Sequence, residues 1–390
     1  MPTDEKGTQI QSTQDIVDGD LWYTVHNMLT TPITKTKTGT KIKAWLKTYF
    51  DALYPPGVNV LTNGGFRVAQ RGVGPFTSVS TFVNNDDSYL LDGCVFLANG
   101  SDTCDVSRVY DAEFKSDYKI RLDVETANRR FGILLPVGYK DSLNIIKNGR
   151  ASLQFKIKRT GTSVSNIRAY LLSWNGTADV ITSDPISAWG SAGSDPTFVA
   201  NWTAENVAAN IPITTSTVLQ QIENIVVDTA SVANLGVLII VDDTDAVVGD
   251  FIDIGDIKLE AGSTCTAWVN KPAAQEEADC QRLCTVFQGE AVTWAVFGMG
   301  MCISTTACYV AVHFPVEMRV VPTLSYDALA NFRVWVDAVT ATPTVMANTY
   351  GTKKTGLLAI TVASGLAAGK AVMLSINNTT NAILVFSAEL

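Results

Sequence analysis

Three tryptophans are the side chains of this 390-residue sequence that could most readily hold a ligand. Trp174, Trp189 and Trp202 lie in a stretch that is rich in Ser, Gly, Asp and Asn. Indole rings in such loops can form a platform for sugar rings, while Asn and Asp side chains bind the sugar hydroxyls. The alternative is that the three rings anchor long loops in the core. The sequence leaves both interpretations open, so the three residues are candidate ligand-binding residues.

A second candidate is a run of acids that could bind Ca²⁺ with side-chain oxygens: Asp242, Asp243, Asp245 and Asp250. This run lacks the glycine and the final glutamate of an EF-hand loop, so we interpret it as a solvated acidic turn and expect no metal. Glu276 and Glu277 are adjacent carboxylates, which face different directions on a helix, and we expect both to be solvated. With two histidines and no Ser-His-Asp arrangement, phosphate-binding loop or zinc helix, the sequence predicts no catalytic site and no cofactor.

Composition narrows the class of partner. The formal net charge of -9 argues against binding to nucleic acid or to anionic lipid, both of which require clustered Lys and Arg. No apolar run approaches the roughly 18 residues of a membrane span, and the polar first residues lack the apolar segment of a signal peptide. We therefore expect no membrane insertion. The seven cysteines are an odd number, and we expect them to be reduced, buried side chains rather than disulfides.

The first 57 residues are predicted to form a separate N-terminal segment. One or two short strands are indicated within residues 15–34, and a helix is indicated over residues 41–54, which Pro55, Pro56 and Gly57 end. One helix of this length cannot bury its apolar face alone, so the face must pack on its own domain, on another subunit or on a docking partner. The apolar face consists of Ile42, Trp45, Leu46, Tyr49, Phe50 and Leu53.

The rest of the chain is predicted to be mainly β, with two antiparallel β-sandwich domains over residues 58–270 and 290–390 and a linking helix over residues 271–289. Residues 118–124 and 153–158 alternate between apolar and polar types, and residues 235–241 are the continuous apolar run of a central strand. We expect a bulge at Gly255-Asp256 and no helix within residues 58–269.

Several segments, in order, resemble bacteriophage tail fibres and related virion appendages. Residues 59–72, NVLTNGGFRVAQRG, are similar to the opening of a carbohydrate-binding-module-like β-sandwich in those proteins. The segments IGDIKLEAG (254–262), EEADCQR (276–282) and FPVEMRVVP (314–322) resemble its last strand, its closing helix and a strand of a C-terminal sandwich. The run 15–54 is similar, more loosely, to fibre N-termini that attach to the virion. The aromatic pair that usually follows Gln-Arg is replaced here by Leu283-Cys284, which removes groups that could stack on a sugar.

Two structural expectations concern residues 59–72, which we call the opening segment. Asn63-Gly64-Gly65 offers positive-φ positions for a tight turn. The Arg71 side chain is expected to be fixed by a carboxylate or by backbone carbonyls rather than presented to a ligand.

The resemblance implies a non-catalytic virion protein, a tail fibre or appendage that mediates attachment to the host surface. Such a protein is assembled in the bacterial cytoplasm, and we expect a homotrimer, since residues 355–390 carry few charges, as expected of a surface buried against identical neighbours. We expect the N-terminal segment to dock on other virion proteins of the tail, portal region or capsid. Host glycan would bind at the loops around Trp174–Trp202 and at the tip of the C-terminal sandwich. One alternative is a head fibre or capsid decoration protein. Another is a tailspike glycan depolymerase, which the sequence favours less because it shows no regular β-helix repeat.

Overall fold

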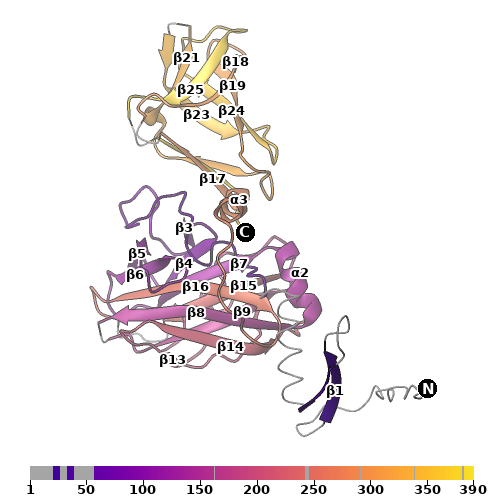
Figure 1. The fold of residues 1–390 in the computed structure, drawn as a ribbon. Coiled ribbons are helices and arrows are strands. Elements are labelled where there is room, and N and C mark those ends of the chain that lie inside the picture. Colours follow the sequence, from indigo (N-terminus) through magenta and orange to yellow (C-terminus); the bar gives the residue numbers. More distant parts are fainter. Residues whose placement is uncertain are drawn as a thin grey trace, which may run out of the picture. The chain divides into compact units, whose positions relative to one another are not determined.

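The computed structural model describes residues 21–26, 33–38 and 57–390, apart from residues 162, 242–245, 290–291, 338 and 380–381. The chain forms two compact units, Met1–Val58 and Asn59–Leu390. In the first unit, β1 (Leu21–His26) pairs antiparallel with β2 (Ile33–Thr38) (Figure 1). The predicted helix 41–54, with its six apolar residues, lies outside the described residues, as do Asp242, Asp243 and Asp245. The predicted domain boundaries stay predictions.

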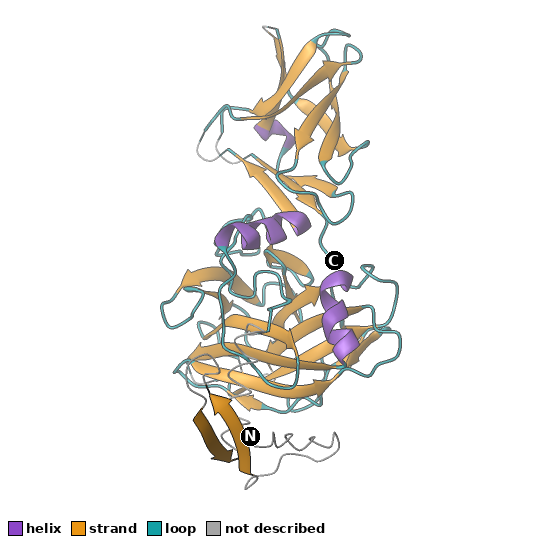
Figure 2. Cartoon of the chain, turned by 45° about the vertical axis from the view of Figure 1, so that its right-hand side comes forward, coloured by secondary structure: helices purple, strands orange, loops and turns teal. Residues whose placement is uncertain are grey.

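Two antiparallel sheets form the first sandwich of the second unit (Figure 2). Sheet I consists of β3 (Ser88–Leu91), β4 (Cys94–Ala98), β7 (Phe131–Val137), β9 (Asn166–Trp174), β12 (Trp202–Ala204), β13 (Ile211–Pro212) and β15 (Asn234–Val241). Its strand order is β12-β9-β15-β7-β4-β3, with β13 also paired to β9. Sheet II has the order β14-β8-β16-β6-β5 and consists of β5 (Cys104–Tyr110), β6 (Tyr118–Val124), β8 (Arg150–Thr160), β14 (Val218–Val226) and β16 (Phe251–Ala261). The predicted mainly β fold is confirmed.

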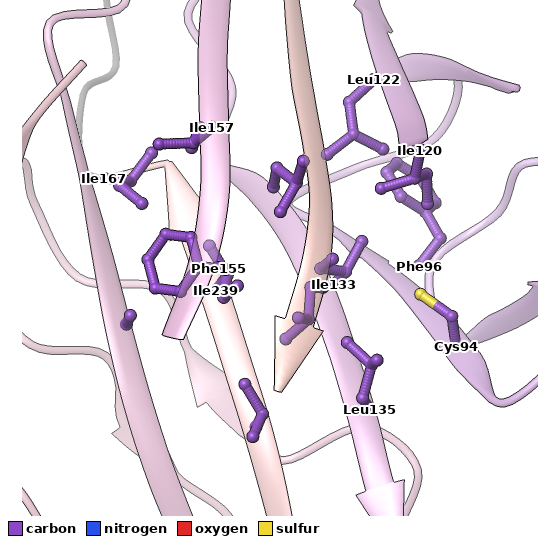
Figure 3. Packing of buried hydrophobic residues seen from close by; sticks show 14 of the residues in the cluster. Cys94, Phe96, Ile120, Leu122, Ile133, Leu135, Phe155, Ile157, Ile167 and Ile239 are labelled. Carbon is purple, nitrogen blue, oxygen red and sulfur yellow. The ribbon is translucent and has the colours of Figure 1, made fainter. Parts of the chain in front are cut away.

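The core lies between the two sheets, because apolar side chains occupy the facing side of each strand. Ile120 and Leu122 of sheet II and Ile133 and Leu135 of sheet I are among the buried residues that meet there (Figure 3). Strand β15 is buried along its whole length and pairs with β7 and β9, which confirms the prediction of a central strand.

One helix within the sandwich was not predicted. α2 (Tyr139–Asn148) begins after Gly138 and ends at Gly149, whose φ of 70° closes the helix in the left-handed conformation. It packs against β8, β15 and β16 and buries Ser142 and Ile145. The expectation of a stretch without helices is therefore wrong at this point: Leu143, Ile145 and Ile146 form one apolar face of a short, otherwise polar helix between two glycines, and this face was overlooked among the surrounding strands.

A second sandwich follows α3 (Ala273–Leu283) (Figure 2). The sequence predicts a linking helix over residues 271–289, and the helix ends earlier than predicted because residues 284–288 pair with β26 as a strand. Sheet III has the order β17-β26-β20, and sheet IV has the order β22-β21-β25-β18-β19-β24-β23. The strands are β17 (Cys284–Gln288), β18 (Val296–Cys302), β19 (Ala307–His313), β20 (Thr323–Tyr326), β21 (Phe332–Val336), β22 (Val339–Ala341), β23 (Pro343–Asn348), β24 (Thr355–Val362), β25 (Ala371–Ile376) and β26 (Ile383–Ser387). A separate core, which includes Val310, Phe332 and Leu374, lies between the two sheets.

The opening segment 59–72 is shaped by close packing. Asn63 and Phe66 have positive φ values of 55° and 53°, whereas Gly64 and Gly65 do not. A Cβ on Gly64 would lie 2.1 Å from the Ile257 carbonyl oxygen, and a Cβ on Gly65 would lie 2.6 Å from Cβ of Ser116. The expected positive φ is thus found at Asn63 but not at the two glycines, which are required because the neighbouring backbone and side chains leave no room for a Cβ.

The same segment connects the two sandwiches at a site that we call the joint, formed by Gln70, Arg71, Cys284, Arg319 and Glu389. Arg71 Nη1 donates to Glu389 Oε1 at 3.0 Å and Nη2 donates to Oε2, which confirms that a carboxylate fixes this guanidinium. Gln70 Nε2 donates to the Cys284 carbonyl at 2.7 Å, and Arg319 Nη2 donates to the Glu389 carbonyl at 2.8 Å. Gln70 and Arg71 of the first sandwich therefore bind oxygens of the second. Arg319 belongs to the second sandwich, and its Nη1 donates to the Asp179 carbonyl of the first at 3.2 Å.

Two further expectations concern the whole described chain. All seven cysteines are free thiols, and six of them are buried, with Cys265 partly exposed. Within the described residues, neither of the α-helices has the length and apolar character needed to cross a membrane.

Candidate binding cleft

The three candidate tryptophans lie where the chain between β9 and β12 covers the outer face of sheet I. A small sheet of β10 (Ile186–Ala188) and β11 (Thr197–Phe198) forms in this segment. Its apolar side chains and those of the outer face form a core of their own, which includes Leu134, Tyr170, Ile186 and Leu238. We call residues 175–210 the covering segment.

Trp174 is buried beneath this segment, and Trp202, which belongs to the segment, is buried on its inner side against Trp174. Their exposed fractions are 6% and 4%, and their ring centroids lie 5.4 Å apart. Trp174 Nε1 donates to the Thr177 carbonyl and Trp202 Nε1 to the Thr182 carbonyl, both at 3.0 Å. Trp189 is half-buried, and its carbonyl accepts a hydrogen bond from Arg130. This placement agrees with the anchoring interpretation, and a binding role for the three residues stays a prediction.

The outer face of sheet II carries charged side chains instead of apolar ones. Lys119 bridges Asp253 and Asp111, while Arg121 Nε donates to Asp253 Oδ1 at 2.8 Å. Lys158 donates to Asp111 Oδ2 at 2.7 Å. Burial raises the pKa of the Asp111 carboxyl, but hydrogen bonds from Lys119 and Lys158 outweigh it and hold that pKa well below its usual value. The network fixes the loop 111–117 across this face.

A cleft of about 440 Å³ opens on this charged face, within the size range of small-molecule sites. Its lining comes from β8 (Gln154 and Lys156), from β14 (Leu219 and Gln221), from the bulge of β16 (Asp256), from the loop 111–117 (Lys115) and from the segment after β16 (Cys265, Thr266, Ala267 and Trp268). We call it the sheet II cleft.

The predicted bulge builds one side of the sheet II cleft. The register of β16 against β8 shifts between Gly255 and Lys258, which confirms the bulge, and Asp256 has a φ of 49° there. The Asp256 carboxylate accepts hydrogen bonds from the backbone N–H of Lys115 at 2.7 Å and of Ser116 at 3.0 Å. A bulge re-aims a side chain, and this one points a carboxylate at the loop that it fixes.

Trp268 forms the aromatic wall of the cleft. Its Nε1 donates to Asn270 Oδ1 at 2.8 Å, and Asn270 Nδ2 donates in turn to the Lys115 carbonyl at 2.9 Å, which links the two walls. Gly65 lies beneath the ring, since a Cβ there would be 3.0 Å from Trp268 Cζ2. The indole ring is thus held at its edge and packed on the opening segment, which fixes its position beside the cleft.

Hydrogen-bond donors remain free on the floor of the cleft. Gln154 is 3% exposed, and its Oε1 accepts from Gln221 Nε2 at 3.3 Å. Its own Nε2 has no acceptor among the described residues, and because this atom is not among the buried unpaired ones, it is open to solvent in the cleft. The Cys265 thiol, whose pKa burial and the nearby Glu223 and Glu260 raise to about 11, is protonated and is no nucleophile at neutral pH.

A second cleft, of about 430 Å³, lies beside α3 and is lined in part by Arg67, Gln70, Tyr118 and Glu276. Its polar groups bind one another, because Arg67 Nη1 donates to Glu276 Oε2 at 3.0 Å and Gln70 bonds within the joint. Glu276 is buried, so the expectation that it is solvated is wrong: Arg67 compensates its charge. The sheet II cleft, with an aromatic wall and a free amide, is the better candidate.

Sequence reasoning did not find the sheet II cleft. Its lining comes from residues 115, 154–156, 219–221 and 256–268, and no local spacing shows that these segments meet. Two signals were present: the polar alternation of Gln154, Lys156 and Lys158 on a strand, and Trp268 just beyond the last strand. Among the described side chains, no group of three or more His, Cys, Asp or Glu could hold a metal ion.

Comparison with known proteins gives matches in structure only. No protein-family model matches the sequence, and no curated protein matches it. The TmCBM61 carbohydrate-binding module, solved with β-1,4-galactotriose, is 13% identical and matches over 53% of this chain and 99% of that chain, with a TM-score of 0.30. The CBM22-1 xylan-binding domain of Paenibacillus barcinonensis Xyn10C is 10% identical over 44% of this chain and 87% of that chain, with a TM-score of 0.25.

A bacteriophage protein is also among the matched structures. The enzymatically active domain of tailspike protein 4 of bacteriophage CBA120 is 14% identical over 48% of this chain and 21% of that chain, with a TM-score of 0.29. The matches therefore include both carbohydrate-binding modules and an enzyme, and TM-scores this low carry no argument about function. The β-sandwich assignment rests on the strand pairing of the chain itself.

Proposed function

We propose that the chain is a non-catalytic attachment protein of a bacteriophage virion, a tail fibre or appendage, which binds host-surface glycan in the sheet II cleft. The motif order along the sequence supports the virion assignment. The observation that carries the binding site is the pairing of an indole wall, Trp268, with an amide donor, Gln154, that has no acceptor among the described residues. Sugars offer an apolar C–H face and hydroxyl acceptors, which match these two groups.

The glycan site is tested by replacing its aromatic wall. Trp268→Ala removes the stacking surface, and since burying a large apolar side chain contributes about 1.5–3 kcal/mol, we expect glycan affinity to fall about tenfold or more. Binding is measured on a glycan array with the full-length protein, and circular dichroism monitors the fold. Gln154→Leu, which keeps the volume of a buried side chain and removes the amide, should weaken binding without unfolding the sheet.

The matched control is Trp189→Ala, which removes an indole of the same size from the covering segment. Under this proposal Trp189→Ala retains glycan binding. If Trp189→Ala abolishes binding while Trp268→Ala and Gln154→Leu leave it unchanged, the site lies at the tryptophans that the sequence singled out and the sheet II cleft is not the site.

We further propose a homotrimer with its interface on the outer face of sheet IV. Apolar side chains are exposed there, including Met299 (68%), Met301 (53%) and Val345 (52%). Among the described outward-facing strand residues of this sheet, Arg333 is the only Lys, Arg, Asp or Glu, and it stacks between Trp294 and Trp335 at 3.6 Å from each ring. Seven strands of about six residues cover about 29 by 20 Å, or about 580 Å² of flat area, which is about three quarters of the roughly 800 Å² per partner of a standard interface.

The oligomer is tested by placing a charge on this face. The wild-type protein is expected at about three times its 41.9 kDa chain mass, and Met299→Asp is expected to give monomers, because three buried carboxylates would meet no counter-charge. Mass photometry over a concentration series gives the result. Val79→Asp, on a side chain that is 92% exposed in the first sandwich, is the matched control and should stay trimeric. A wild-type protein that is monomeric at every concentration contradicts the trimer.

A further inference from the structure

We infer that the sheet II cleft prefers glycans that carry carboxylates over neutral glycans of the same size. The inference rests on the proposed glycan binding and names the chemical class of the ligand. It is carried by the charges and hydrogen-bond donors that line the cleft.

The lining contains two ammonium groups and one carboxylate. That carboxylate, Asp256, is already engaged by the backbone N–H groups of Lys115 and Ser116 and by Lys156 Nζ at 3.2 Å. Lys115 is exposed, and its ammonium has no carboxylate partner among the described residues. The cleft therefore presents positive charge that the protein does not itself neutralise.

Two carboxylates lie near the far wall, and neither belongs to the lining of the cleft. Glu260 is paired with a lysine, whereas Glu223 is exposed and has no ion-pair partner among the described residues. Glu260 accepts from Thr266 Oγ1 at 2.7 Å and pairs with Lys258 Nζ at 3.2 Å, and Glu223 Oε1 accepts from the Cys265 backbone N–H at 2.7 Å. Glu260 is 1% exposed and faces a buried lysine, so its charge is balanced within the protein.

The free groups of the cleft are donors. Gln154 Nε2 and the Lys115 ammonium both lack intrachain acceptors among the described residues. A carboxylate accepts hydrogen bonds only, and hydrogen bonds between charged groups are stronger than those between neutral groups. A uronic or sialic acid residue would place its carboxylate on these donors while its ring packs on Trp268.

The net charge of -9 does not oppose this preference at short range. Charges more than about 8–10 Å from the site are screened at physiological ionic strength. Lys115 lines the cleft without an ion-pair partner among the described residues and acts inside that distance on a bound carboxylate. The net charge of the whole chain affects mainly the approach of a long acidic polymer.

The test is titration calorimetry of the full-length protein with pairs of matched ligands. A hexuronate trimer and a sialylated trisaccharide are each compared with the neutral form obtained by reducing the carboxyl group. We expect the acidic form of at least one pair to bind about fivefold or more tightly, which is the effect of one partly exposed ion pair near 1 kcal/mol. Lys115→Gln should remove this preference, whereas Lys147→Gln, which changes an exposed lysine of α2 outside the cleft, should leave the preference unchanged.

The outcomes separate the two proposals. If acidic and neutral forms bind equally, or if Lys115→Gln leaves the preference intact, the charge inference is overturned while glycan binding stands. If no acidic or neutral ligand binds, the proposed glycan binding is overturned and the inference with it. A preference that weakens as salt rises from 50 to about 300 mM supports the ion pair, since screening acts on partly exposed charges.

Discussion

Replacing Glu389 by Gln is expected to destabilise the protein by about 3–5 kcal/mol, because the change leaves the Arg71 guanidinium buried without its counter-charge. Both side chains are 4% exposed. Burial alone would lower the pKa of Arg71, but the Glu389 carboxylate outweighs burial and raises it, so the guanidinium stays charged in the folded protein. The loss is measured as the change in the free energy of unfolding in a denaturant series.

Two controls isolate the charge from the packing of the joint. Lys354→Met breaks the pair of Lys354 with Glu317, whose side chains are 75% and 56% exposed, and should change stability by less than about 0.5 kcal/mol. The double variant Arg71→Met with Glu389→Met removes both charges and should recover most of the loss. A loss below about 1 kcal/mol in Glu389→Gln would contradict the structural role assigned to this pair.

Trp202→Ala is expected to cost about 3–5 kcal/mol, the usual loss for truncating a buried aromatic side chain. The ring packs on Trp174 and over Gly236, where a Cβ would lie 3.3 Å from Trp202 Cη2. Without it, the covering segment loses its attachment to sheet I. Limited proteolysis should therefore cut within residues 175–210, and thermal unfolding should shift to lower temperature.

Trp202→Phe is the conservative comparison, because it retains an aromatic ring and gives up one hydrogen bond to Thr182. It should recover most of the stability that Trp202→Ala loses. If Trp202→Ala instead leaves stability unchanged and abolishes glycan binding, the tryptophan is a ligand platform and its buried position has been misinterpreted.

The strands could be predicted because their pattern is local. Alternation over residues 118–124 matches β6, and a continuous apolar run over residues 235–241 matches β15, which is covered on both faces. The bulge at Gly255-Asp256 was detectable because it interrupts an alternating strand. α2 was not detected, although Leu143, Ile145 and Ile146 form an apolar face, because the helix has only ten residues and lies between two strongly apolar strands.

The candidate site could not be predicted, for a physical reason. A tryptophan in a polar stretch looks the same in sequence whether its ring is exposed or lies beneath a covering segment. Trp202 is buried because it pairs across strands with Trp174, a contact that only the folded sheet reveals. Gln154 lines a cleft because a loop near residue 115 and the segment near residue 268 come together over sheet II.

The joint has a consequence for synthesis of the protein. Arg71 and Glu389 are 318 positions apart, with most of both sandwiches between them. At an elongation rate of about 5–20 residues per second, Glu389 is synthesised about 15–60 s after Arg71. The first sandwich can fold on the ribosome during that time, but its arginine remains hydrated until the last strand of the second sandwich arrives. Closure of the joint therefore requires that both sandwiches have been synthesised.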